Sequence, residues 1–236
     1  MGNYWAEIAD KNQTQRQTQL LKNHLNPSGI VLDLACGTGR HTLTLQAEGF
    51  DMVGLDVSAK LLQIAKQRYP AVQVIRGDLR FLPFKSEAFV AVVSMDTSLG
   101  YLPTQEDDLQ SLAEARRVLT QGGVLVVDVF NRERLSQKYS ESHTSDWMEY
   151  PSFYLKQKRQ VPSAGERLYD VWVVRDKSTG RLVEFMHSVR LYRLDVLRGL
   201  LEKAGFAVRE VLGDYEGQPF SRESARLIFV ASARVF

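Results

Sequence analysis

Three aspartates and a pair of glycines follow short apolar runs in the first third of the chain. Asp33 lies near the end of the run GIVLDLA, just before Cys36 and Gly37-Thr38-Gly39, while Asp56 and Asp78 close the later runs DMVGLD and VQVIRGD. Glycine has no Cβ, so a ligand can approach its backbone closely. A carboxylate offers two acceptor oxygens and no donor. This pattern predicts a site for a small molecule that carries hydrogen-bond donors.

The spacing of the glycines separates two kinds of nucleotide site. A dinucleotide fingerprint needs a third small residue three positions after the second glycine, and Thr42 stands there instead. Asp33 would also repel a pyrophosphate. A Walker phosphate loop needs Gly-Lys-Ser or Gly-Lys-Thr, and neither follows. A ligand with an amine and a sulfonium therefore suits this acidic rim better, and a nicotinamide-dependent oxidoreductase is kept as the alternative enzyme.

The elements that would position these residues alternate between strand and helix patterns. Ser58 is a suitable N-cap for a helix at 59–69. Strands alternating with helices predict an α/β fold with a parallel sheet covered on both faces. Ligands of such sheets bind at the carboxyl ends of the strands, where the three aspartates stand. The predicted strands are 29–35, 51–56, 72–78, 89–96 and 124–130, and the predicted helices are 14–25, 39–48, 59–69 and 106–119, the last ended by residues 121–123.

The pattern changes after residue 130. Runs of β-branched and aromatic residues, FYLKQKRQV, RLYDVWVVRD and RLVEFMHSVRLY, are separated by turn residues at 162–165 and 176–180. They predict hairpins of an antiparallel sheet. Helical periodicity returns at 195–206, with Gly205 as the expected C′ residue that ends the helix. Two strands at 206–214 and 225–235 follow. We therefore expect an α/β domain made of 1–130 and 191–236, with an inserted β subdomain at 131–190 that forms a lid over the substrate.

Bulk composition excludes several classes of protein. The chain has 236 residues, 44% of them hydrophobic, and a net charge of +2 that gives no electrostatic case for nucleic acid or an anionic membrane. It has no apolar run of membrane-spanning length and no secretory signal pattern. Its single cysteine, Cys36, forms no intramolecular disulfide, which suits a cytoplasmic location. It is expected to pack in the core rather than act as a nucleophile.

Five segments together make the chain similar to the class I S-adenosylmethionine-dependent methyltransferases. They are VLDLACGTGRH (31–41), GLDVS (54–58), GDLRFLPF (77–84), MDTSLGYL (95–102) and RVLTQGGVLVVDV (117–129). The segments FNRERL (130–135), RLY (190–192), LLEKAGF (200–206) and GDYEGQPF (213–220) resemble the small-molecule subgroup that carries a β insertion after the fifth strand. The resemblance implies a Rossmann-like doubly wound sheet of seven strands in the order 3-2-1-4-5-7-6, with the last strand antiparallel.

The resemblance also implies roles for particular residues. Asp33 would hold the ammonium of S-adenosylmethionine, Asp56 the ribose hydroxyls and Asp78 the adenine amino group. Each residue also has an ordinary explanation, because Gly-x-Gly is often only a tight turn and an aspartate often caps a helix or a turn. Their common position at strand ends favours the functional interpretation. The full set expected to bind the cofactor is Asp33, Ala35, Gly37, Thr38, Gly39, Arg40, Asp56, Val57, Gly77, Asp78, Leu79 and Met95.

The reaction implied is methyl transfer to N or O of a small-molecule acceptor, with S-adenosylhomocysteine as product. Such a displacement proceeds largely by alignment and desolvation, and a base is needed only if the acceptor must first lose a proton. Asp96 is the candidate base by position, and His143 and His187 in the inserted segment are weaker candidates. Candidates for the substrate pocket are Tyr4, Trp5, Tyr101 and Tyr192, with Tyr4 and Trp5 expected to close over the cofactor. No metal is expected, and the protein is expected to be a monomer or homodimer. A methyltransferase-fold binding or regulatory protein without turnover stays as the non-enzyme alternative.

Overall fold

The computed structural model describes residues 2–8, 11–162 and 165–234. Its larger sheet has seven strands in the order β3-β2-β1-β4-β5-β12-β11, in which β12 runs antiparallel to both of its neighbours. This order confirms the predicted fold class. The strands are β1 (Ile30–Leu34), β2 (Asp51–Asp56), β3 (Val74–Arg76), β4 (Phe89–Ser94), β5 (Leu119–Phe130), β11 (Phe206–Leu212) and β12 (Arg226–Ala233).

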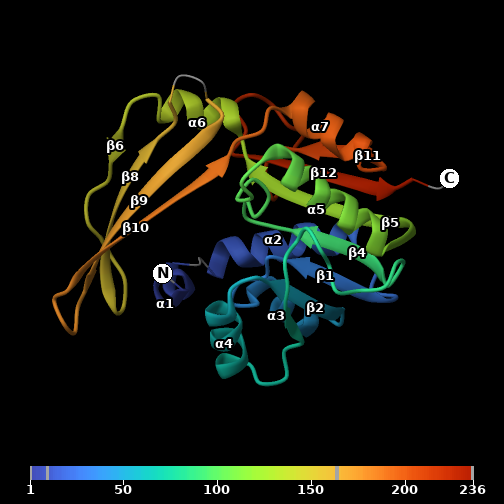
Figure 1. Ribbon diagram of the computed structural model, residues 1–236, viewed down its shortest axis with the longest axis horizontal. Coiled ribbons are helices and arrows are strands. Elements are labelled where there is room, and N and C mark those ends of the chain that lie inside the picture. Colours follow the sequence, from blue (N-terminus) through green and yellow to red (C-terminus); the bar gives the residue numbers. More distant parts are fainter. Residues whose placement is uncertain (1, 9–10, 163–164, 235–236) are drawn as a thin grey trace.

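Helices cover both faces of this sheet (Figure 1). On one face, α5 (Gln105–Val118) and α7 (Leu194–Lys203) pack onto the side of β1 that carries Leu32. On the other face, α2 (Lys11–His24) and α3 (Arg40–Ala47) pack onto the side that carries Val31. Side chains alternate along a strand, so Asp33 shares the face of Val31 and points toward α3. α4 (Ala59–Arg68) packs against β2 and β3.

Local sequence explains where most of these helices begin and end. The Ser58 hydroxyl accepts a hydrogen bond from the Leu61 amide, as predicted for the N-cap of α4. Thr104 and Asp107 form a reciprocal capping box at the start of α5. One expectation is wrong: residues 121–123 do not separate α5 from β5. The Leu119 amide still bonds to Ala115 while Leu119 already pairs in the sheet, and the glycines form an irregularity inside β5.

The second sheet is antiparallel, as predicted, and follows a helix that the sequence pattern did not predict. That helix is α6 (Arg132–Lys138), whose N-cap Asn131 accepts a hydrogen bond from the Glu133 amide. The strands are β6 (His143–Thr144), β7 (Met148–Glu149), β8 (Phe153–Gln160), β9 (Arg167–Asp176) and β10 (Leu182–Arg190), in the order β10-β9-β8-β6 with β7 also paired to β8. The turn at 176–180 is confirmed by four hydrogen bonds to Asp176, whereas the turn at 162–165 includes residues 163–164, which lie outside the described residues.

Helix α1 (Gly2–Ile8) joins the two sheets. It lies between the inserted sheet and the seven-stranded domain (Figure 1). Tyr4 packs edge-on against Phe153 with ring centroids 4.8 Å apart, and Glu7 accepts hydrogen bonds from the Ser152 amide and hydroxyl. Toward α4, the Arg68 guanidinium donates to the Ala6 carbonyl. The N-terminal helix therefore bridges the inserted sheet and the domain that carries the predicted site.

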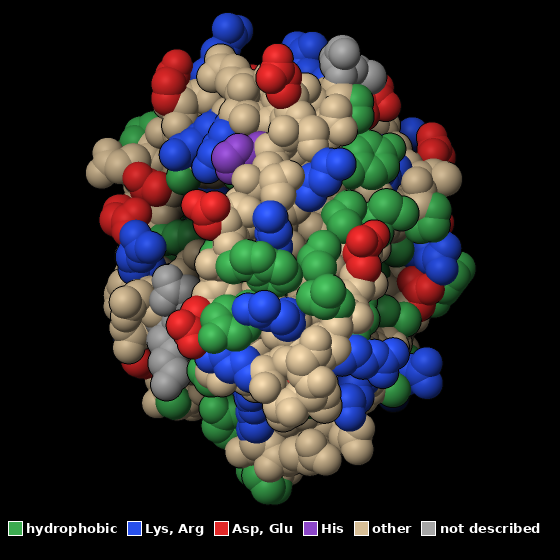
Figure 2. All heavy atoms as spheres, turned by 90° about the vertical axis from the view of Figure 1, so that its left-hand side faces the viewer, with side chains coloured by type: hydrophobic (Ala, Val, Ile, Leu, Met, Phe, Trp, Pro, Cys, Tyr) green, Lys and Arg blue, Asp and Glu red, His purple; other side chains and the backbone are tan. Residues whose placement is uncertain are grey.

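The outward side of the inserted region differs from its inner side. Figure 2 shows hydrophobic side chains interspersed with Lys and Arg over this face. The Arg175 guanidinium lies 4.8 Å and the Lys177 ammonium 4.9 Å from the Tyr154 ring centroid. On the opposite side of β9, Leu168, Asp170, Trp172 and Val174 are buried. No helix in the described part of the chain is long and apolar enough to cross a membrane.

Candidate active site

A cavity of about 600 Å³ opens where β1, β2 and β4 end at their carboxyl ends. Its walls come from four connecting loops, from α3 and α4, and from the N-terminal helix α1. Most of the predicted cofactor residues and two of the predicted substrate residues meet there. The lining residues are Trp5, Asp33, Ala35, Cys36, Gly37, Thr38, Arg40, His41, Asp56, Val57, Ser58, Leu61, Asp78, Leu79, Met95, Asp96, Ser98, Tyr101 and Leu102.

The loop between β1 and α3 is shaped by three left-handed residues. Ala35, Gly37 and Gly39 have φ angles of 54°, 57° and 75°. Such angles cost a non-glycine residue energy, which explains the glycines at two of the three positions. Gly39 does not line the cavity but faces α4, and it serves to start α3. Cys36 packs as predicted: a Cβ on Gly54 would lie 2.7 Å from its Sγ, and burial raises the pKa of its thiol.

Asp33 is buried beneath this loop and is held by α3. Its Oδ2 accepts hydrogen bonds from the Thr42 amide at 3.1 Å and the Thr42 hydroxyl at 2.7 Å. Burial raises the pKa of Asp33 to about 6, although both of these bonds oppose the shift. Thr42, the residue that breaks the dinucleotide fingerprint, is therefore the partner that positions Asp33.

Asp56 connects the ends of β1 and β2. Its Oδ2 accepts from the Gly37 amide at 2.8 Å, and its Oδ1 accepts from the Ser58 amide at 2.7 Å. Both oxygens keep a further lone pair that is available to a ligand. The neighbouring Val57 lines the cavity with 64% of its surface exposed. The site therefore combines a fixed carboxylate with an open apolar surface.

Asp78 is held by an arginine that sequence reasoning missed. The Arg80 side chain donates to both oxygens of Asp78, at 3.1 and 2.7 Å, and also to Asp107 at 3.0 Å. These bonds lower the pKa of Asp78. Leu79 lines the cavity beside it. Gly77 does not: a Cβ there would lie 2.8 Å from Leu55, so this glycine is required by packing.

The loop after β4 carries Met95 and Asp96 to the floor of the cavity. Asp96 and Thr97 both have left-handed φ angles, 59° and 65°, which are unusual for side-chain-bearing residues. The Asp96 carboxylate accepts hydrogen bonds from the Arg40 guanidinium at 2.8 Å and from the side-chain amide of Gln13 at 3.2 Å. These two contacts fix the position of the Asp96 carboxylate at the floor of the cavity.

A buried network holds this strained loop, and sequence reasoning missed it as well. Asp128 on β5 accepts from the Asp96 amide at 3.0 Å, from the Tyr215 hydroxyl at 3.0 Å and from Arg226 Nε at 2.7 Å. Arg226 also donates to the Thr97 hydroxyl at 2.8 Å. The signal was present, because Asp128 and Arg226 are charged residues inside otherwise apolar strand segments.

The network continues through α2 to the cofactor loop, which is the loop between β1 and α3 together with Arg40. The Gln17 amide nitrogen donates to the Tyr215 hydroxyl at 2.9 Å, and its carbonyl oxygen accepts from Arg40 at 2.7 Å. The same oxygen lies 2.9 Å from Nε2 of His41, and burial lowers the pKa of that imidazole well below its usual value. His41 is therefore neutral, and its ring hydrogen bonds to α2.

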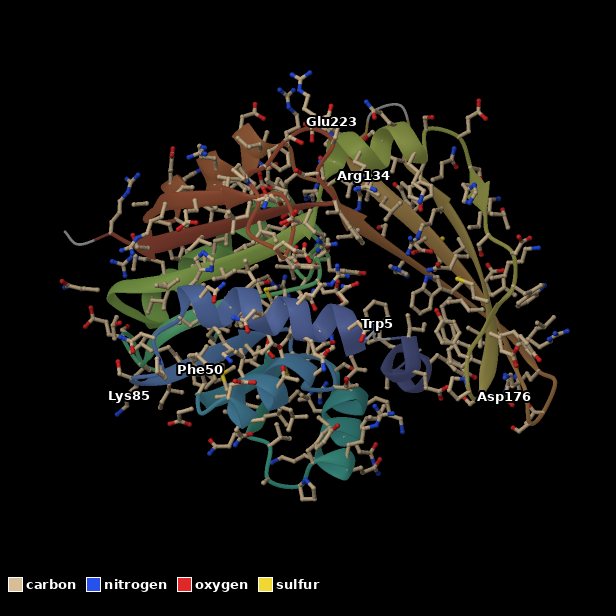
Figure 3. All side chains as sticks on the ribbon, turned by 180° about the vertical axis from the view of Figure 1, so that it is seen from behind. Trp5, Phe50, Lys85, Arg134, Asp176 and Glu223 are labelled. Atoms are coloured by element: carbon tan, nitrogen blue, oxygen red, sulfur yellow. The ribbon has the colours of Figure 1, made fainter. Side chains whose placement is uncertain are left out.

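Aromatic side chains form the opposite wall. Trp5 lines the cavity and stacks on Trp172 of the inserted sheet, with ring centroids 5.4 Å apart. Figure 3 shows Trp5 between α2 and the inserted sheet. Tyr101 also lines the cavity. Tyr4 packs on the inserted sheet instead, against Phe153 and Phe185.

Tyr192 does not reach this cavity, and its expected place in the substrate pocket is corrected. Its side chain lies in the core beneath α5 and α7, where its hydroxyl donates to Asp108 at 2.6 Å. Of the two histidines of the inserted segment, His143 is exposed, whereas His187 is largely buried and stacks on Tyr101 with ring centroids 6.0 Å apart. Among the residues that the structure describes, no group of three or more His, Cys, Asp or Glu is arranged to hold a metal ion.

Comparisons with known proteins agree with this arrangement. The family described as "Methyltransferase domain" matches residues 31–123. YqeM of Bacillus subtilis (strain 168), provisionally named a methyltransferase, is 28% identical over 233 residues, which are 96% of this chain and 93% of YqeM. The dTDP-3-amino-3,4,6-trideoxy-alpha-D-glucopyranose N,N-dimethyltransferase of Streptomyces venezuelae is 37% identical over 125 residues, 53% of this chain and 50% of the relative. The structure of S-adenosylmethionine-bound CalS10, an amino pentose methyltransferase of Micromonospora echinaspora, matches with a TM-score of 0.72 at 21% identity. The match covers 98% of this chain and 94% of the CalS10 chain.

The sheet order and the site at the strand ends define a Rossmann-like methyltransferase. The chain carries a methyltransferase domain at residues 31–123 and is similar to methyltransferases over nearly its whole length, so it is an enzyme of that kind. Its fold is shared with S-adenosylmethionine-dependent methyltransferases, and its cofactor is S-adenosylmethionine. The nicotinamide alternative raised by the glycine loop is thereby set aside.

Proposed function

We propose that the chain methylates N or O of a small-molecule acceptor, with the cofactor held at the ends of β1 to β4. The observation that carries this proposal is the fixed pair of Asp56 oxygens beside the open apolar surface of Val57. Asp56 would accept the ribose hydroxyls, while Val57 and Leu79 would flank the adenine. Asp78 would accept from the adenine amino group.

The charged side chains of the cavity also suit the methionine end of the cofactor. S-adenosylmethionine carries an ammonium and a sulfonium, and the cavity is lined by four aspartates. Asp33, whose pKa is raised to about 6 by burial, would gain an ionic partner from the ammonium. Ala35, Gly37 and Thr38 would face the methionine portion. Arg40, beside them, would pair with its carboxylate while holding Asp96.

The cofactor supplies an electrophilic methyl group, so the protein contributes mainly alignment and exclusion of water. Met95, Leu102 and Trp5 present apolar surface to the cavity. Asp96 is fixed by Arg40 and Gln13, and we assign it to positioning rather than to proton transfer.

The small-molecule acceptor is supported by the relative from Streptomyces venezuelae, whose name specifies an amino sugar nucleotide as its substrate. We propose that residues 131–190 form a substrate lid on the domain composed of 1–130 and 191–236. The contact between Trp5 and Trp172, which joins the cavity wall to the inserted sheet, supports this division. We also propose a cytoplasmic monomer or homodimer that needs neither nucleic acid nor membrane. The unpaired, buried Cys36 supports the location, and size-exclusion chromatography with light scattering tests the assembly.

Calorimetry with S-adenosylhomocysteine tests the binding site. We expect a single site per chain, and a thermal shift with S-adenosylhomocysteine but not with NADH or NADPH. The reverse pattern would overturn the proposal. Incubation of a metabolite extract with methyl-labelled cofactor, read by mass spectrometry, then tests turnover: no labelled product from an extract would favour a binding or regulatory protein.

A further inference from the structure

A second group of polar side chains lies on the inner face of the inserted sheet. Three of them stand side by side across neighbouring strands, because Asp170 on β9 pairs in register with Arg159 on β8 and with His187 on β10. Asp170 Oδ2 lies 2.8 Å from Arg159 Nε and 3.8 Å from His187 Nε2. Only 3% of the Asp170 side chain is exposed.

Two atoms of this row have no hydrogen-bond partner among residues 2–8, 11–162 and 165–234. Asp170 Oδ1 and His187 Nδ1 are both buried and make no hydrogen bond. Buried polar atoms in folded proteins are nearly always paired, and an unpaired one marks a strained or functional position. A carboxylate oxygen and an imidazole nitrogen at adjacent positions therefore point to a ligand that can donate hydrogen bonds.

This row is connected to the cofactor cavity by aromatic rings. Tyr101, which lines the cavity, stacks on His187 with an interplanar angle of 22°. Trp172 packs edge-on against His187 at 5.4 Å and stacks on Trp5, which also lines the cavity. His187 and Asp170 lie behind these wall residues rather than in the cavity lining, so a molecule that enters between Trp5 and Tyr101 comes next to His187 when the Tyr101 ring moves aside.

We propose that Tyr101, His187 and Asp170 form the acceptor end of the active site, and that they take an amine-bearing acceptor whose ammonium proton passes to His187. This inference rests on the proposed function. An ammonium has no lone pair and cannot be methylated, so one N–H bond breaks and its proton goes to the imidazole. The nitrogen lone pair then forms the N–C bond, while the electron pair of the breaking C–S bond stays on sulfur.

The charges around His187 suit an amine better than a hydroxyl. Burial and the Arg159 guanidinium lower the pKa of His187, whereas the Asp170 carboxylate opposes that shift. Tyr101 stays protonated, because burial together with the Asp170 and Asp96 carboxylates raises its pKa to about 12. The imidazole is thus a neutral, weak base. Removal from water into the aromatic-lined cavity lowers the pKa of an ammonium, which brings its proton within reach of the imidazole. An aliphatic hydroxyl is a far weaker acid and keeps its proton.

The tautomer follows from the same contacts. With its proton at Nε2, which faces Asp170, His187 keeps a lone pair at Nδ1 for the incoming proton. The ring faces of Tyr101 and Trp5 attract a cationic acceptor before that proton leaves. The positive charge of Arg159 is balanced by its ion pair with Asp170, which weakens its repulsion of a cationic acceptor.

The first test is nuclear magnetic resonance of the histidine rings in the full chain saturated with S-adenosylhomocysteine. Benzylamine, cyclohexylamine and tyramine are titrated at fixed pH, each beside the compound in which a hydroxyl replaces the amino group. We expect at least one amine to shift the His187 ring signals, its hydroxyl counterpart to leave them unchanged, and Asp170→Asn to lower the His187 titration midpoint. No shift with any amine would overturn the inference.

The second test is labelled-methyl transfer to the amine that shifts His187. We expect His187→Gln to lower kcat by about 100-fold or more, with S-adenosylhomocysteine affinity within twofold of the original protein. The exposed His143→Gln, on the same sheet, and Glu184→Gln, which matches the charge change of Asp170→Asn, serve as controls with unchanged kcat. Preferred transfer to oxygen, or full activity of His187→Gln, would overturn the inference. Loss of S-adenosylhomocysteine binding by the original protein would instead refute the proposed function.

Discussion

Replacement of Asp56 by alanine is expected to weaken the folded loop and the cofactor site by separate amounts. Asp56 accepts two backbone hydrogen bonds, from Gly37 at 2.8 Å and from Ser58 at 2.7 Å. A hydrogen bond to a charged group contributes about 1.5–3 kcal/mol when buried. Both amides lie in partly exposed residues where water can replace the carboxylate, so we expect a total loss of about 1–3 kcal/mol in the free energy of unfolding. Two lost ribose contacts would reduce cofactor affinity by a further factor of about 10–100, equivalent to about 1–3 kcal/mol.

Two measurements separate these effects. Urea denaturation without ligand gives the change in stability, and calorimetry with S-adenosylhomocysteine at a temperature where the variant is folded gives the change in affinity. Asp51→Ala is the matched control, because Asp51 lies at the exposed opposite end of the same strand. An Asp56→Ala protein that is destabilised but binds S-adenosylhomocysteine within twofold of the original would show that the ribose lies elsewhere. Asp56→Asn is not a mild substitute, since its amide group would face a backbone N–H at one of the two positions.

Three further predictions concern the surroundings of the cavity. Asp33 has a folded pKa raised to about 6, and a bound ammonium favours its ionised form; S-adenosylhomocysteine affinity should therefore rise from pH 5 to pH 7, and an equal slope in Asp33→Asn would contradict this. Trp5→Ala removes the stacking on Trp172 and should weaken S-adenosylhomocysteine binding by about 0.5–1.5 kcal/mol, whereas unchanged calorimetry would show that α1 does not cover the cofactor. Arg226→Met leaves the buried Asp128 charge without its ionic partner and should lower the free energy of unfolding by about 3–5 kcal/mol in urea; a loss under 1 kcal/mol would argue against an ionised pair.

Sequence patterning predicted the seven strands because each had an independent local signal, and the family resemblance supplied their order in one sheet. Apolar runs fell between helices with recognisable caps, such as Ser58 before α4, and the alternation then left few arrangements to consider. The ends of β1 and β2 were predictable for the same reason, since ligands of parallel sheets bind there. Asp33 and Asp56 thus line one cavity, although the strands that bear them are separated by α3 in the chain.

Helix α6 and the partners of the site residues were not predictable in this way. Residues 132–138 contain no buried side chain, so the helix had no apolar face to give it a periodic pattern. Arg80 binds Asp78 through a local turn that an apolar pattern does not describe. Tyr192 was misplaced because an aromatic residue in a subgroup motif was taken for a pocket residue, while its hydroxyl in fact satisfies the buried Asp108.

The buried network determines which parts of this site can move independently. Asp128 and Arg226 bind the loop of Asp96 and Thr97, and through Tyr215 and Gln17 they extend to Arg40 in the cofactor loop. The loop between β1 and α3, the floor of the cavity and α2 are therefore joined by buried and partly buried hydrogen bonds, and the buried ones are costly to break.

The inserted sheet is joined to the cofactor half at one end of β10. The Arg190 amide donates to the Gly100 carbonyl at 2.8 Å, and the Arg190 guanidinium donates to the buried Asp108 at 3.2 Å. Nearer the cavity, the inserted sheet meets the cofactor side through the stacked rings of Trp5 and Trp172 and of Tyr101 and His187. Such contacts can slide at little cost compared with breaking buried hydrogen bonds. We infer that β9 and β10 adjust to the acceptor around this anchored end, while the cofactor half keeps its shape. Hydrogen exchange should accordingly slow in β9 and β10 when an acceptor binds, and equal slowing in β1 and β4 would show that the two halves respond together.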